Sequence, residues 1–188
     1  MKAKSEPGRN VGTLAEMTSG GPILDIVGEE IDPIWAAGFR GFFWGEGTLG
    51  MTARLGNPKV NPLIKWVRHS IAVTASIGLR SDDSALLVEF QRRLGGRLRT
   101  EPYRGADSRK TITRWTVGTA QQNVRIGRLL ESPTELPFSK ARQLSVWRRA
   151  VETKVRAGAH SGARYSDEDH AYMVWAAAEL QRLRRWAG

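Results

Sequence analysis

Residues 35–47 constrain the fold of this chain more than any other stretch. They are rich in aromatic and small residues, and the preceding Asp32 and Pro33 are a favourable N-cap and first residue for a helix. On such a helix, small residues that recur every three or four positions form one smooth face. Two glycines inside a helix cost about 1 kcal/mol each relative to alanine, so we expect another backbone to pack closely there. This small face consists of Ala37, Gly38, Gly41 and Gly45.

The predicted helix ends at an acid, Glu46. If the same helix of a second copy packs on the small face, a two-fold axis brings two Glu46 carboxylates together. Two carboxylates at such a junction form a site for a divalent metal ion. A tightly packed core helix within one chain remains an alternative. Residues 45–50 also match the GxGxxG spacing of dinucleotide-binding loops, but they follow a helix rather than a strand, which disfavours that function.

Residues 39–47, FRGFFWGEG, resemble the signature of the LAGLIDADG homing endonucleases. The resemblance implies that the motif helices of two copies pack by their small residues, because the chain carries one such motif. It also implies that Glu46 and the adjoining Gly45 bind Mg²⁺ and that the homodimer cleaves double-stranded DNA at a long pseudo-palindromic site. The chain departs from the family pattern at Trp44, where the family usually has an acid two positions before the metal ligand.

The charge of the chain favours a polyanionic partner. Its 188 residues carry a formal net charge of +10, and most of the basic residues are Arg, which bonds phosphate and guanine bidentately. A basic soluble protein without such a partner remains an alternative. The absence of Cys excludes disulfides, zinc ribbons and thiol catalysis, and three scattered His residues make a zinc site improbable. Residues 34–44 are too short for a membrane span, and without an N-terminal apolar segment we expect a cytoplasmic, nucleoid-associated protein, with organellar expression left open.

The order of predicted elements is αββαββα, an α+β fold. The resemblance implies the same order, with four antiparallel strands in each subunit forming a saddle that lies on DNA. We expect an N-terminal extension (1–30), an endonuclease domain (31–156), a linker (157–165) and a C-terminal helix (166–188) whose apolar positions include Trp175. After the motif helix, the expected elements are strands 48–55 and 70–77, a helix capped by residues 81–83 and ended by Gly95 and Gly96, strands 97–103 and 110–118 with a turn around 105–108, and helices 121–130 and 139–156.

Alternation along the strands separates a buried face from a polar one. Ile71 and Val73 share one face of the second strand, for example, whereas Ser70 and Thr74 share the other. Arg on the polar face suits guanine, and Ser or Thr tolerates several bases. An ordinary surface position remains an equal alternative for Arg97 and Arg99. The expected DNA contacts of the strands are Thr52, Arg54, Ser70, Thr74, Ser76, Arg80, Arg97, Arg99, Arg114 and Thr116.

Residues 136–143, LPFSKARQ, form a second candidate segment. By spacing alone, they are a loop that leads into a basic helix start, where a lysine is usually a solvated charge. The resemblance implies that Lys140 stands beside the scissile phosphate, where it stabilises charge or polarises the attacking water, with Arg142 as a further DNA contact. The family often has a polar residue near that water after the second strand, a role that would fall to Arg80 here.

We therefore predict a homodimeric, Mg²⁺-dependent DNA endonuclease with Glu46 and Lys140 as its catalytic residues. A catalytically inactive relative that binds DNA or intron RNA, as a regulator or maturase, is the alternative. A basic scaffold or ribosome-associated protein would account for the charge, but not for a small face that ends in Glu46.

Overall fold

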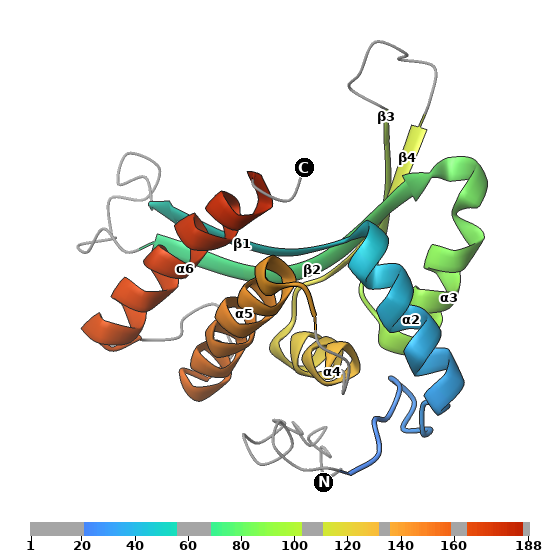
Figure 1. The fold of residues 1–188 in the computed structure, drawn as a ribbon, viewed down its shortest axis with the longest axis horizontal. Coiled ribbons are helices and arrows are strands. Elements are labelled where there is room, and N and C mark those ends of the chain that lie inside the picture. Colours follow the sequence, from blue (N-terminus) through green and yellow to red (C-terminus); the bar gives the residue numbers. More distant parts are fainter. Residues whose placement is uncertain (1–20, 56–68, 103–110, 132–135, 159–164, 186–188) are drawn as a thin grey trace, which may run out of the picture.

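The computed structural model describes residues 21–55, 69–102, 111–131, 136–158 and 165–185. Within these ranges, a curved sheet of four antiparallel strands has helices α2, α4 and α5 on one side (Figure 1). The predicted α+β fold and its αββαββα order are confirmed, and two further helices follow within the described ranges. The elements are α2 (Pro33–Glu46), β1 (Gly47–Leu55), β2 (His69–Arg80), α3 (Ala85–Leu94), β3 (Arg97–Pro102), β4 (Thr111–Val117), α4 (Ala120–Leu130), α5 (Phe138–Arg156) and α6 (Asp167–Arg185).

The strands are ordered β1-β2-β4-β3, and every neighbouring pair is antiparallel. Residues directly opposite each other on such strands share a face. Met51 lies opposite Val73, and Ile77 lies opposite Trp115, and all four are buried. The predicted buried face of the sheet is therefore confirmed, and it forms the floor of the core.

Helix α2 begins where the sequence predicts, because a side-chain oxygen of Asp32 accepts the Trp35 N–H at 2.9 Å. Its aromatic side is buried in the core. The Phe39 ring meets the Phe90 ring edge-on at 5.0 Å and the Trp115 ring at 6.1 Å. Because these rings hold one side of the helix against the sheet, the opposite side is directed away from this core.

Two side chains attach α4 and α5 to the middle of the sheet. The Asn123 amide donates to the Val73 carbonyl at 2.8 Å, and the Trp147 indole donates to the Thr74 carbonyl at 2.9 Å. Both carbonyls belong to β2 just before its pairing with β4 begins at Ala75. The helices thus donate side-chain hydrogen bonds to β2 carbonyls next to the point where β4 joins the sheet.

The expected cap of α3 is wrong. Residues 81–83 form a separate 3₁₀ turn, and α3 begins only at Ala85. Asp82 pairs with Arg80 at 2.8 Å, and the Ser81 hydroxyl lies 3.1 Å from the Thr113 hydroxyl, so these side chains bond the sheet instead of the helix N–H groups. The second strand is also longer than predicted and includes residues 78–80.

Gly95 and Gly96 end α3 as predicted, with φ angles of 74° and 95°. A Cβ at Gly96 would lie 2.7 Å from the Thr116 carbonyl oxygen, so the strand after the helix can approach β4 only with glycine there. The predicted turn around 105–108 and most of the predicted linker lie outside the described residues.

The C-terminal helix α6 packs against α5 and β1. Leu180 and Leu183 are buried, but Trp175, which was predicted among the apolar positions of the helix, is 44% exposed. We expected the large apolar side chain of Trp175 to be buried. The way α6 crosses α5 instead places the smaller side chains of Met173 and Ala176 in the interface. Within the described ranges, no helix combines the length and the apolar character needed to cross a membrane.

The segment before α2 lies along α3 and α4. The Ile26 N–H donates to the Arg93 carbonyl at 2.9 Å, and the Arg125 guanidinium donates to the Leu24 carbonyl at 2.6 Å. Arg128 likewise bonds the Gly21 carbonyl. The described part of the predicted extension therefore packs on the domain, while the domain boundaries themselves stay predictions.

Candidate nucleic-acid interface and metal site

The polar face of the sheet brings together all the strand positions predicted to contact DNA. Across β1 and β2, Arg54 lies opposite Ser70, and Gly50 lies opposite Thr74. The rows that cross more than two strands are Thr48, Ser76, Thr116 and Arg97, then Gly78, Arg114 and Arg99, and finally Arg80, Ile112 and Glu101. The alternation of side chains places these rows on the face opposite the buried one.

The arginines of this polar face differ in whether they form an ion pair with a neighbouring acid. Arg80 pairs with Asp82, and Arg99 pairs with Glu101, whereas the structure records no ion pair for Arg114 among the described residues. Sequence reasoning missed Glu101 because it sought only basic and hydroxyl side chains. The odd-numbered alternation that placed Arg97 and Arg99 on one face would have placed Glu101 there too.

Glu46 lies where the small face of α2 meets the polar face of the sheet. It is the last residue of the helix, and Gly47 begins β1 directly after it. Gly45 belongs to the small face, and Thr48 belongs to the polar face. The Glu46 side chain is exposed, and within the described ranges the structure records no hydrogen bond or ion pair for it. Both carboxylate oxygens are therefore available to a ligand.

The small face of α2 is exposed along its length. A Cβ built on Gly38, Gly41 or Gly45 meets no heavy atom within 4 Å. None of these glycines is thus required by packing within the described part of one chain, so the alternative of a tightly packed core helix does not explain them.

One chain supplies only part of a metal site. Within the described ranges, no three His, Cys, Asp or Glu residues lie together in a way that could hold a metal ion. The oxygen donors available at the end of α2, the Glu46 carboxylate and the Gly45 carbonyl, are of the kind that Mg²⁺ prefers. This donor set fits the ion chemically but needs further oxygens besides these two groups.

Lys140 lies at the same end of α2, although it is 94 positions away from Glu46 in the sequence. Its Nζ stands 6.0 Å from the centre of the Trp44 ring, within the range of a cation–π contact. Lys140 is in the first turn of α5, and Trp44 is two residues before Glu46. The structure therefore places Lys140 against the helix residue that stands two positions before Glu46, at the end of α2 where Glu46 lies.

Trp44 is the aromatic residue at the position where the resemblance implies an acid. Its indole Nε1 is buried and has no hydrogen-bond partner among the described residues. Sequence reasoning saw Trp44 only as a departure from the family pattern and missed its contact with Lys140. An aromatic ring can hold a lysine in place and leave its positive charge intact. A carboxylate at the same position would neutralise that charge.

Arg142 turns toward α6. Its guanidinium lies 3.8 Å from the Glu179 carboxylate and 5.9 Å from the centre of the Trp175 ring. The neighbouring Gln143 is 5% exposed and donates to the Leu183 carbonyl. A DNA contact by Arg142 stays a prediction, and Gln143 is committed to the interface between α5 and α6.

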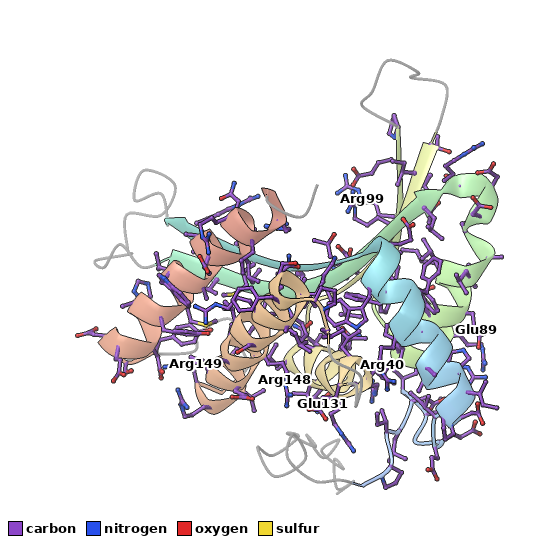
Figure 2. All side chains as sticks on the ribbon, viewed as in Figure 1. Arg40, Glu89, Arg99, Glu131, Arg148 and Arg149 are labelled. Atoms are coloured by element: carbon purple, nitrogen blue, oxygen red, sulfur yellow. The ribbon has the colours of Figure 1, made fainter. Side chains whose placement is uncertain are left out.

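Figure 2 shows Arg148 and Glu131 close together, and their charged groups lie 2.6 Å apart. Arg40 of α2 donates to the Leu129 carbonyl of α4 at 2.9 Å. These contacts tie α2, α4 and α5 to one another on the helical side of the sheet. The Arg-rich composition therefore serves helix packing as well as the polar face.

This chain is similar to known proteins in its structure but not in its sequence. No protein-family model and no curated protein matches this sequence. The homing endonuclease I-TnaI superposes with a TM-score of 0.57 at 18% identity, covering 84% of this chain and 96% of its own. An archaeal intron-encoded homing endonuclease, solved in complex with DNA, also gives 0.57, at 17% identity, covering 80% of this chain and 84% of its own.

The LAGLIDADG meganuclease I-AabMI, solved bound to uncleaved DNA, superposes with a TM-score of 0.52 at 20% identity. The match covers 79% of this chain but 44% of I-AabMI, so the chain corresponds to less than half of that protein. Each of these matches is below 25% identity, so the similarity concerns the fold. The chain thus has the fold of the LAGLIDADG homing endonucleases.

Proposed function

We propose that this protein is a site-specific double-stranded DNA endonuclease that acts as a homodimer. The observation that carries the proposal is the position of Glu46 at the junction of the small face and the polar face. A carboxylate placed there borders both a surface suited to a second copy and a surface suited to DNA. The alternative classes that rest on charge alone do not explain this placement.

DNA binding is supported by the chemistry of the polar face. Arg54, Arg97 and Arg114 are exposed there beside rows of Ser and Thr, and the whole chain carries a net charge of +10. Such a surface supplies phosphate contacts and base contacts together. Two similar structures, the archaeal enzyme and I-AabMI, were solved with DNA.

A homodimer is supported by the exposed small face and by the extent of the structural matches. Two copies packed along α2 would bring two Glu46 carboxylates to the axis, and the target would be pseudo-palindromic because both half-sites meet the same surface. The chain corresponds to almost all of I-TnaI but to less than half of I-AabMI.

Glu46 and the Gly45 carbonyl of each copy would hold Mg²⁺ together with phosphate oxygens. When bound, the metal would activate water and stabilise charge on the cleaved phosphate. Lys140 would lie beside that phosphate, steadied by the Trp44 ring, and would stabilise negative charge on its oxygens. The remaining arginines of the polar face would hold the duplex in register.

Replacing Lys140 with Met should slow single-turnover cleavage by about 10²-fold, the typical loss when one electrostatic stabiliser is removed. Half-buried Lys140 makes no ion pair in the described part of the chain, so the fold should be retained. The variant Lys140→Arg, which keeps the charge, should retain more of the rate. An unchanged cleavage rate in Lys140→Met would show that Lys140 has no catalytic role and is an ordinary solvated charge.

The function itself is tested by incubating the protein with plasmid that carries the DNA flanking its own gene, with and without Mg²⁺. We expect one specific double-strand cut that requires the metal. Specific binding without a cut would favour the non-catalytic DNA-binding protein, which Trp44 in place of an acid keeps as the second candidate. A protein that neither binds nor cuts a particular DNA sequence would contradict both.

A further inference from the structure

An acid lies among the arginines of the polar face. Glu101 follows Arg97 and Arg99 at alternate positions of β3, and these three side chains share one face. If this face meets DNA, a carboxylate there faces phosphates of the same sign, which costs binding energy. We therefore expect the Glu101 carboxylate to make another contribution that offsets this electrostatic cost.

The geometry of the pair indicates that role. The Arg99 Nε lies 3.2 Å from a Glu101 carboxylate oxygen, and the Arg99 side chain is 80% exposed while that of Glu101 is 38% exposed. The recorded ion pair thus joins the carboxylate to Nε, the inner nitrogen of the guanidinium, in a side chain that is largely exposed. Figure 2 shows Arg99 on the side of the sheet away from α3.

Neighbouring arginines are held differently. Arg80 bonds Asp82 through a terminal nitrogen, so the outer end of its guanidinium is engaged. Arg114 lies directly opposite Arg99 across β3 and β4, which places two like charges side by side. A simple alternative is therefore that Glu101 only offsets the repulsion between Arg99 and Arg114.

We propose that Glu101 is a positioning residue that presents the outer end of Arg99 to guanine in the major groove. Guanine offers two acceptors, O6 and N7, to the two terminal nitrogens of a guanidinium. Holding a long side chain in this orientation before binding lowers the entropy lost in the complex. The Glu101 carboxylate would thus increase specificity for one base pair, while its negative charge lowers the overall attraction of the face to phosphate. This inference rests on the proposed DNA-binding function.

The experiment selects bound sequences from a pool of randomised double-stranded DNA in Ca²⁺ and compares them by sequencing. The wild type should enrich guanine at one position of each half-site, and Arg99→Ala should lose that preference by about 5- to 150-fold, the discrimination expected of one bidentate contact. Glu101→Ala should lower the same preference by at least about twofold, because Arg99 is then no longer held in the orientation that binds guanine. Its affinity for unrelated DNA should stay equal or rise, because a negative charge has left the face.

Two variants separate positioning from loss of charge. Glu101→Gln keeps an oxygen that can accept the Nε–H, so it should retain most of the guanine preference. Glu131→Ala removes one negative charge at the end of α4, on the helical side, and should leave base preference unchanged. Thermal unfolding of each variant checks that the fold persists.

Three results would overturn the inference. If Glu101→Ala keeps the guanine preference that Arg99→Ala loses, Glu101 only balances charge. If Glu101→Ala changes the preference at a different position, the acid reads a base itself. A wild type that enriches no sequence at all would overturn the DNA-binding function together with this inference, whereas the first two outcomes would leave that function standing.

Discussion

Replacing Glu46 with Gln is expected to abolish cleavage while leaving DNA binding within about tenfold of the wild type. The amide keeps the size of the side chain but lacks the negative charge that holds a divalent ion. Because the dimer would lose this charge twice, we expect the single-turnover rate to fall by at least about 10³-fold. The measurement is cleavage of a cognate site in Mg²⁺, with binding measured separately in Ca²⁺.

Two features of the structure allow the effect of this substitution to be assigned to the metal site. Glu46 is exposed and makes no recorded contact within the described ranges, so its replacement should not disturb the fold. Glu131→Gln provides the same chemical change on the helical side, where the carboxylate pairs with Arg148 instead, and should leave cleavage intact. Undiminished Mg²⁺-dependent cutting by Glu46→Gln would show that the metal site lies elsewhere.

Gly41→Leu should cost dimerisation and cleavage together while leaving the subunit folded. Among the described residues of one chain, a Cβ at Gly41 meets no atom within 4 Å outside its own helix turn, and leucine also favours the helix more than glycine does, so the subunit should tolerate the change. Against a second copy, however, the added bulk would force the two α2 helices apart and separate the two Glu46 carboxylates. We expect at least tenfold weaker association, roughly the cost of overpacking an interface.

Sedimentation of the free protein and of its DNA complex would measure the association, and thermal unfolding would report on the subunit. Gly41→Ala serves as a graded control, since one methyl group should weaken the dimer less than a leucine. A wild type that stays monomeric in both states, or a Gly41→Leu dimer that cuts both strands at the normal rate, would refute the two-fold interface along α2.

Local patterns in the sequence were sufficient to predict α2 and both faces of the sheet. The Asp32 cap, the small face and the terminal Glu46 all depend on helical spacing, which any window of the sequence contains. The faces of β1, β2 and β4 likewise follow from alternation, because the side-chain period of a strand is two. These features were confirmed because each is specified by neighbours in the chain.

Local patterns failed where a distant partner competed for a side chain. Residues 81–83 have the composition of a helix cap, but Ser81 bonds Thr113 and Asp82 pairs with Arg80 instead. Trp175 has helical spacing suited to burial, yet the crossing of α6 over α5 leaves it exposed. In both cases packing overrode a correct local preference.

The sequence by itself determined the elements, the polar and buried faces, and a carboxylate at the end of a helix with a small face. Only the tertiary structure decided which side chains meet: Lys140 with the Trp44 ring, and Arg99 with Glu101 on the face shared with Arg114. The physical reason is that spacing specifies the direction of a side chain relative to its own element. Contacts between elements depend on how the sheet curves and how helices cross, and those are set by the packing of the whole core.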